Sequence, residues 1–270
     1  MGLTHPTKET GFFDENTSPS PTYDLKNPVS ATTCVSLDLM KLLLKLTLKK
    51  AMTENLEASQ LSLNEVHCLL KLERQIEGSF AESLSLEPLT DVEQQEILEI
   101  GHNFWRYLEA GKISEELVKF LVLSPLMRLT GFFKIPVVLT MENSIPIEVE
   151  DGDTLIKGRL DILAVNQPDA EITATRFWIL VVEAKNSTLD PWAGLPQLLT
   201  YTYKSLQQQA SVWGLTTNGR NYQFVHLTRG NPCTYQILPE LSLIDRERSV
   251  QLVQVLKAIC KLQNVQLQLA

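Results

Sequence analysis

One short strand and its ending constrain this chain more than any other feature. The segment FWILVVEAK, residues 177–185, opens with six consecutive apolar residues and then places Glu183 and Lys185 two positions apart. An apolar run of this length is typical of a strand covered on both faces, as in an α/β protein. Because side chains alternate along a strand, Glu183 and Lys185 share one face and Ala184 points to the other. The C-terminal end of such a strand is where α/β sheets usually carry their sites.

A second carboxylate, Asp161, precedes the apolar run ILAV and lies beside Glu183 if the two strands are neighbours. Two carboxylates that converge repel each other unless a proton or a cation lies between them. Mg²⁺, with Mn²⁺ as a substitute, suits such oxygen ligands. The ammonium of Lys185 is suited to orient a water and to counter charge on a phosphorus. These residues together predict metal-assisted hydrolysis of a phosphodiester.

The pattern after Gly111 predicts an α/β fold. Its expected elements are a helix over 113–132, a strand over 135–141, a polar connection over 142–155, a strand over 156–165, the strand over 177–185, a helix from Pro191 or Leu195, two strands around the turn Asn218-Gly219, and a C-terminal helix over 246–263. The chain contains neither G-x-G-x-x-G nor G-x-x-x-x-G-K-[ST]. Phosphate binding by a glycine-rich loop is therefore not expected.

The N-terminal part divides into a tail and a helical region. Residues 1–33 are rich in Ser, Thr, Pro and charge and predict a flexible tail. Residues 34–111 predict helices over 37–52, over 61–80, and from a Thr90 cap to Gly111. The lysines of the first helix recur every four residues opposite leucines, which fits a partner-binding or membrane-surface helix, or a helix whose leucines simply pack in the core. Residues 112–270 form the predicted α/β domain.

Charge and cysteine content exclude several protein classes. The 270 residues carry a formal net charge of −8, but residues 1–111 hold the acidic excess, with 9 Lys/Arg against 17 Asp/Glu. The remaining part is nearly neutral, so a nucleic-acid partner is not excluded. The four cysteines and four histidines show no metal-ligand spacing, which argues against a zinc site or a disulfide framework. No signal peptide or membrane span is recognisable, so a cytoplasmic protein without membrane contact is expected.

Asp161 followed by Glu183-Ala184-Lys185 resembles the D…E-x-K signature of the PD-(D/E)XK nuclease superfamily, the restriction-endonuclease-like fold. The run Gln197-Leu-Leu-Thr-Tyr201 is similar to the Q-x-x-x-Y element of the RecB-type branch. The run Thr217-Asn-Gly-Arg220, with Tyr222 and Phe224 after it, is similar to a hairpin in the N-terminal nuclease domain of type I restriction enzyme R subunits, and the helix over 113–132 resembles the first helix of that domain. The resemblance spans about residues 112–230. Leu160 stands where the signature has proline, and no helicase motor is present.

The resemblance implies a central mixed sheet flanked by helices, with an α-helical N-terminal extension, and it implies roles for individual residues. Asp161 and Glu183 bind the metal, the Ala184 carbonyl completes a ligand, and Lys185 positions the water. One acid of the first helix, Glu115 or Glu116, holds a second metal or a bridging water, with Glu115 preferred. Gln197 contacts the phosphate or orients Lys185, and Tyr201 packs behind it.

The resulting prediction is a Mg²⁺-dependent deoxyribonuclease, an endonuclease in restriction, defence or repair. DNA is the expected substrate, contacted by Gln197 and Tyr201. Two arginines, Arg159 and Arg220, are candidates for phosphate contacts, although single exposed arginines are usually only solvated. The helical N-terminal region is expected to dock a protein partner or second subunit, and a homo-oligomer stays open. The alternative is a catalytically silent protein of the same fold that binds nucleic acid or serves assembly.

Overall fold

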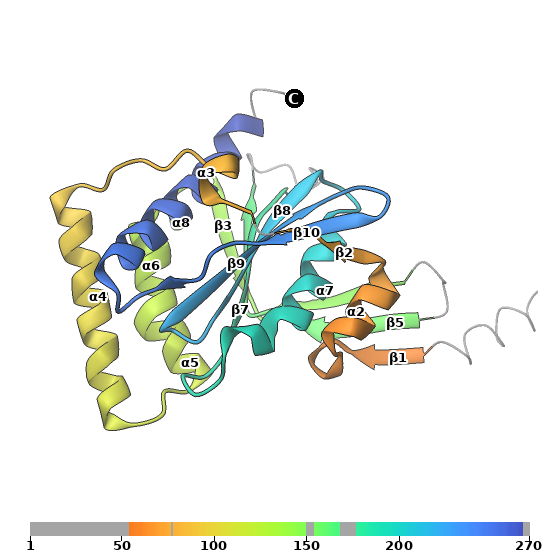
Figure 1. Cartoon of the computed structure of the whole chain (residues 1–270), viewed down its shortest axis with the longest axis horizontal. Helices are drawn as coiled ribbons and strands as arrows, with labels where there is room; N and C mark the ends of the chain where they lie inside the picture. Colours follow the sequence, from red (N-terminus) through yellow and green to blue (C-terminus); the bar gives the residue numbers. More distant parts are fainter. Residues whose placement is uncertain (1–53, 77, 150–153, 168–176, 267–270) are drawn as a thin grey trace, which may run out of the picture. The chain divides into compact units, whose positions relative to one another are not determined.

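The structure is a computed structural model that describes residues 54–76, 78–149, 154–167 and 177–266 (Figure 1). The tail expected over 1–33 and the basic helix expected over 37–52 lie outside these residues. None of the helices in the described ranges is long and apolar enough to cross a bilayer.

Helices and strands occur in runs along the described chain rather than in strict alternation. The strands are β1 (Glu54–Glu57), β2 (Leu72–Arg74), β3 (Val137–Met141), β4 (Ser144–Glu148), β5 (Thr154–Arg159), β6 (Ile162–Asn166), β7 (Phe177–Ala184), β8 (Ser211–Thr217), β9 (Asn221–Thr228), β10 (Cys233–Ile237) and β11 (Leu241–Ser242). The helices are η1 (Ala58–Gln60), α2 (Leu63–Leu70), α3 (Phe80–Ser83), α4 (Asp91–Ala110), α5 (Glu115–Val118), η2 (Lys119–Leu123), α6 (Ser124–Leu129), η3 (Pro191–Gly194), α7 (Leu195–Ser205) and α8 (Arg246–Gln266).

The centre of the fold is a mixed sheet with the strand order β2-β10-β9-β8-β7-β6-β3, and β11 pairs with β9. Strand β7 runs parallel to β8 and antiparallel to β6, which makes it an interior strand. Helices flank this sheet (Figure 1). The predicted α/β fold with a central mixed sheet between helices is confirmed at this level.

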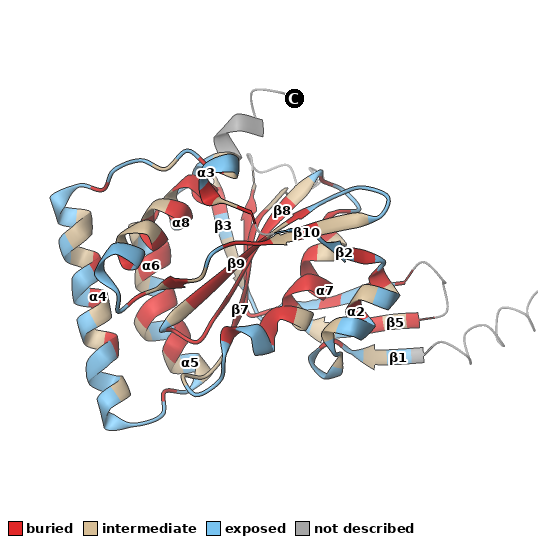
Figure 2. Ribbon diagram, in the orientation of Figure 1, coloured by how far each residue is buried: buried red, intermediate tan, exposed pale blue. Residues whose placement is uncertain are grey.

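Two apolar clusters cover the two faces of the sheet, which explains the unbroken apolar run of β7. Leu180 and Val182 face the cluster built with α4, α6 and α8, whereas Val181 faces the cluster built with α2 and α7. The inner strands from β6 to β9 are accordingly buried along most of their length, whereas the edge strands β2 and β3 are largely exposed or half-buried (Figure 2). Glu183 and Lys185 follow Val181 on the α7 face, as the alternation of strand side chains predicts.

A smaller sheet with the order β1-β5-β4 adjoins the α7 side of the fold. The expectation of one strand over 156–165 is wrong, because the chain leaves the small sheet after Arg159 and enters the large sheet at Ile162. The antiparallel partner makes the same step, since β3 pairs with β6 and β4 pairs with β5. Backbone hydrogen bonds from Leu160 N to the Asn143 carbonyl and from Glu142 N to the Asp161 carbonyl hold this crossing together. Asp161 thus lies at the junction of the two sheets.

Three further segments were given an expected secondary structure, and the structure differs from it in two of them. The helix expected over 61–80 ends at Leu70, because Lys71 adopts a left-handed φ of 49° and the chain continues as β2 beside β10. The polar connection expected over 142–155 contains β4, in which Ile145 and Ile147 alternate inward. The helix from the Thr90 cap to Gly111 is confirmed, with a capping box at its start.

Candidate active site

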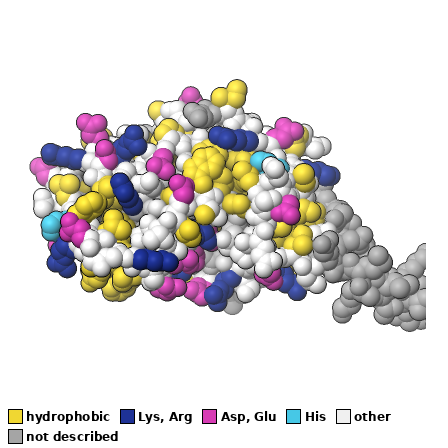
Figure 3. Space-filling model, turned by 60° about the horizontal axis from the view of Figure 1, so that its bottom comes forward, with side chains coloured by type: hydrophobic (Ala, Val, Ile, Leu, Met, Phe, Trp, Pro, Cys, Tyr) yellow, Lys and Arg dark blue, Asp and Glu magenta, His cyan; other side chains and the backbone are white. Residues whose placement is uncertain are grey.

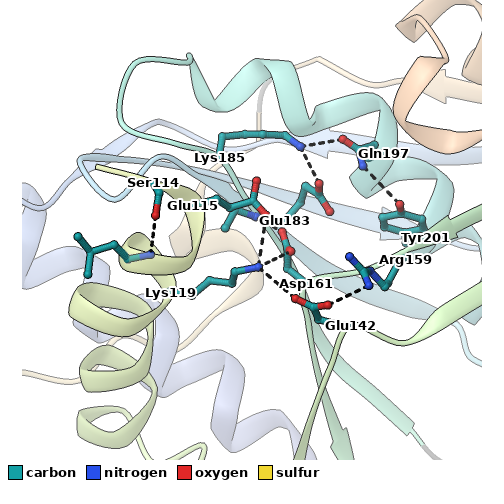
Figure 4. A network of polar contacts seen from close by, with 12 residues as sticks. Ser114, Glu115, Lys119, Glu142, Arg159, Asp161, Glu183, Lys185, Gln197 and Tyr201 are labelled. Carbon is teal, nitrogen blue, oxygen red and sulfur yellow. Dashed lines mark hydrogen bonds and ion pairs between the residues drawn. The ribbon is translucent and has the colours of Figure 1, made fainter. Parts of the chain in front are cut away.

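The polar end of β7 forms one half of the site. Glu183 is only 3% exposed, and its Oε1 accepts a hydrogen bond from Lys185 Nζ at 2.7 Å. The same ammonium donates to Gln197 Oε1, also at 2.7 Å (Figure 4). The acid and the lysine that share a strand face therefore also contact each other.

Asp161 brings the second carboxylate to this point. Ile162 pairs with Val182, so Asp161 is placed next to Glu183 by the register of β6 and β7. Its Oδ2 accepts a hydrogen bond from the Ala184 backbone N–H at 2.7 Å. The expected neighbourhood of these strands is confirmed, and a backbone donor holds Asp161 in a fixed orientation. For Ala184 the structure shows this N–H contact, whereas the role of its carbonyl as a ligand stays a prediction.

A helical segment from α5 through η2 to α6 supplies further charged groups. Pro125 has no N–H to donate, and the turn before it winds as a π-helix in which Ser124 N donates to the Lys119 carbonyl, five residues back. On this segment Lys119 is buried, and its Nζ lies 2.9 Å from Asp161 Oδ1 and 3.3 Å from Glu115 Oε1. Glu116 is exposed and lies outside this network. Of the two acids left open by the sequence, Glu115 is the one directed to Asp161.

Helix α7 supports the lysine from behind. Gln197 Nε2 lies 3.4 Å from the Tyr201 hydroxyl, one turn further along the helix. Tyr201 is 1% exposed and packs against Gly158, where an added Cβ would lie 2.6 Å from the tyrosine oxygen. This burial corrects the expectation that Tyr201 contacts nucleic acid. Gln197 accepts a hydrogen bond from Lys185 Nζ, and its two expected roles, contact with the phosphate or orientation of Lys185, stay predictions.

Burial and neighbouring charges shift the pKa of three groups in the site. Burial, followed by the charge of Asp161, raises the pKa of Glu183 to about 8, against the opposing effect of Lys185. Burial and then Asp161 also raise the pKa of Glu115. Burial opposes the charged form of Lys119, but its hydrogen bond and charge interaction with Asp161, together with Glu115, outweigh burial and raise its pKa. The carboxylates destabilise one another, and Lys119 stays charged among them.

One atom of this cluster lacks a partner. Glu183 Oε2 is fully buried and has no hydrogen-bond partner among the described residues. A buried polar oxygen without a partner is costly, and a cation on it would remove that cost. No set of three or more His, Cys, Asp or Glu side chains in the described ranges is arranged to hold a metal ion. Mg²⁺ commonly uses only one or two carboxylates and keeps several waters, so Asp161 and Glu183 fit this ion.

The two candidate arginines lie in different surroundings. Arg159 ends β5, is exposed, and forms an ion pair with Glu142, which in turn lies 3.8 Å from Lys119 Nζ. Arg220 lies at the β8–β9 turn, where its carbonyl accepts a hydrogen bond from Leu243 N. Only Arg159 therefore belongs to the edge of the charged network in Figure 4.

Sequence reasoning missed Lys119 and Glu142. The signal for Lys119 was its position four residues after Glu115, which places both side chains on one face of the helix. Glu142 had no such signal, because its place depends on the crossing of the strands between the two sheets.

Surface charge is mixed rather than segregated. On the face drawn in Figure 3, Lys and Arg side chains are interspersed with Asp and Glu and do not merge into one basic patch. An extended electrostatic footprint of the kind that many DNA-binding domains carry is not seen on this face.

Comparison with known proteins gives little beyond this geometry. No protein-family model and no curated protein matches the chain. One similar solved structure is described as a fragment of a candidate HsdR subunit of a type I restriction enzyme from Vibrio vulnificus YJ016. It shares 18% identity at a TM-score of 0.34, and the match covers 55% of this chain and 26% of that one.

Proposed function

We propose that this protein is a Mg²⁺-dependent nuclease of the PD-(D/E)XK type that hydrolyses phosphodiester bonds of DNA, as an endonuclease in restriction, defence or repair. One observation carries the proposal. The buried Glu183, with one oxygen lacking a partner, lies beside Asp161 and has Lys185 on its other oxygen. Two carboxylates and an adjacent ammonium at a sheet end are the groups that this chemistry requires.

In this proposal Asp161 and Glu183 hold the divalent ion. When bound, the ion supplies Lewis-acid stabilisation of the negative charge that develops on the phosphate oxygens. Asp161 is kept in place by the Ala184 N–H, and Glu183 by the rigid β7 strand, so neither carboxylate has to reorganise when the ion binds.

Lys185 acts on the water and on the phosphate. Its ammonium has three donors, of which two are directed to Glu183 and Gln197, so the remaining donor can orient the attacking water or a phosphate oxygen. The water oxygen loses a proton to solvent and forms the new bond to phosphorus, while the bond from phosphorus to one sugar oxygen breaks and that oxygen takes up a proton from solvent. The positive charge of Lys185 favours the additional negative charge of this transition state.

A catalytically silent scaffold is the second candidate, and a specific observation favours it. Asp161 forms an ion pair with Lys119, and Glu183 forms one with Lys185. In a protein that never binds a metal, buried carboxylates would need such lysines to balance their charge. Against this candidate stands Glu183 Oε2, which these lysines leave without a partner.

Incubation of the purified protein with circular and linear DNA tests the proposal. With Mg²⁺ or Mn²⁺ we expect cleavage of both substrates, because an endonuclease needs no free end. Glu183→Gln and Lys185→Ala should each lower the rate at least 100-fold, whereas Lys204→Ala at the end of α7 should cleave like the parent. Equal activity in all four proteins would indicate a contaminating nuclease, and DNA binding without any cleavage would favour the scaffold.

A second measurement separates metal binding from catalysis. Mn²⁺ should raise the melting temperature of the parent but not that of Asp161→Ala, because the ion binds the folded state through this carboxylate. The absence of a shift in the parent would contradict the proposed metal site.

A further inference from the structure

Lys119 has surroundings that the proposed reaction does not explain. Lys119 is 7% exposed, and its ammonium lies 2.9 Å from Asp161, 3.3 Å from Glu115 and 3.8 Å from Glu142. Burying an ammonium is expensive unless carboxylates surround it, and here three carboxylates do so. This arrangement is built from three separate parts of the chain, which are helix α5, the β3–β4 connection and the β5–β6 junction (Figure 4).

The oxygens around Lys119 are those that a second cation would use. Two-metal phosphodiester sites place their ions about 3.5–4 Å apart, so that one carboxylate contacts both ions. In this site Asp161 is the carboxylate that two ions could share. An ion on one side of it would also contact Glu183, and an ion on the other side would contact Glu115 and Glu142. The second side is taken by the Lys119 ammonium, whereas Glu183 Oε2 on the first side has no partner.

We propose that Lys119 is a built-in cation that takes the place of a second metal ion, so that the site binds a single divalent ion at Asp161 and Glu183. This inference rests on the proposed nuclease function. It changes the role of Glu115, which holds the Lys119 ammonium instead of a second metal. A covalently attached charge stays at the site at any metal concentration, so one bound ion suffices to complete it.

The number of bound Mn²⁺ ions tests the proposal directly. Titration followed by the electron paramagnetic resonance of free Mn²⁺ should give one ion per chain for the parent. Lys119→Ala removes the charge and empties the space of the ammonium, so Asp161 and Glu115 can turn toward an ion there and the count should rise to two. Lys112→Ala, at an exposed position just before the same helix, should remain at one.

Two further variants keep the test independent of folding. Lys119→Arg preserves a cation and should bind one ion, whereas Lys119→Ala combined with Glu115→Gln should lose the second ion again. In a thermal melt, Mn²⁺ should stabilise Lys119→Ala more than the parent, because that variant has uncompensated carboxylates without metal.

The failures of the two proposals can be told apart. A parent that cleaves DNA and binds one ion, together with a folded Lys119→Ala that also binds one, would overturn the role of Lys119 alone. A cleaving parent with two ions would do the same. A parent that binds no ion and cleaves no DNA would overturn the nuclease function, and this inference with it.

Discussion

In the proposed metal site, a proton and a divalent ion would compete for the carboxyl group of Glu183. Its raised pKa of about 8, caused first by burial and then by Asp161, means that without a divalent ion it carries a proton at neutral pH. A metal ion must displace this proton, so metal binding releases a proton and becomes tighter as the pH rises.

The same group makes the stability of the metal-free protein depend on pH. The pKa of Glu183 is raised from 4.5 to about 8 in the folded state, so the folded protein binds more protons than the unfolded chain between these values. The free energy of unfolding should therefore fall as the pH rises from about 4.5 to about 8, by at most about 1.4 kcal/mol per pH unit. Urea denaturation in EDTA measures this slope. In Glu183→Gln the contribution of this group should be absent, and an identical slope in both proteins would contradict it.

Gln197 illustrates a residue that acts through another. It contacts Lys185 at 2.7 Å, so Gln197→Ala should leave the ammonium free to move and lower the rate about 10- to 100-fold. The loss should be in kcat rather than in KM, because substrate contacts are unchanged. Gln197→Glu keeps an acceptor oxygen and should recover part of the rate. Comparable losses in both variants would argue against a positioning role.

The start of α7 packs directly on the stems of the two β7 residues. A Cβ added at Gly194 would lie 3.1 Å from Glu183 Cγ and 3.2 Å from Lys185 Cε. We therefore expect Gly194→Ala to shift both groups by a few tenths of an ångström and to lower cleavage more than 10-fold, with little change in melting temperature. Gly101→Ala is a matched control, because its Cβ would lie 3.2 Å from the Leu243 carbonyl, on the α4 side of the fold. Its cleavage rate should equal that of the parent.

Elements differ in how far their sequence determines them. Strand β7 and helix α4 are recognisable because an apolar run and a capping box are local signals. The break between β5 and β6 is not recognisable, because the sequence of an apolar strand does not indicate which sheet the strand joins. The proximity of Asp161 to Glu183 follows from the order of the strands. The ion pair of Asp161 with Lys119 depends instead on how the helical segment packs against the junction of β5 and β6. Local patterns thus predicted the acids and Lys185, and tertiary packing supplied their partners.

Across the molecule, charge predicts weak and local contact with DNA. The net charge is −8, and basic side chains do not gather on the face in Figure 3, so we expect DNA bound across this face to have few of its phosphates neutralised. A plot of log affinity against log salt, measured in EDTA, should have a slope of only about −2 to −3. Arg159→Ala, next to the site, should reduce the magnitude of this slope by about 1. Arg220→Ala should leave the slope unchanged. If Arg220→Ala lowers the slope and Arg159→Ala does not, DNA would instead bind along the β8–β9 turn.

Strands β1 and β2 have a consequence for any shortened form of the protein. They are edge strands, and each pairs in parallel with a strand of the α/β domain, β1 with β5 and β2 with β10. In the full chain the sheets end on the short strands β1 and β2, of four and three residues, whereas a fragment that starts at residue 112 would leave the longer strands β5 and β10, of six and five residues, unpaired on that side. Unpaired edges are templates for association between chains, so this fragment should form concentration-dependent aggregates in light scattering while the full chain does not. Residues 54–74 would then serve as an internal safeguard against self-association, in addition to any role in docking a partner.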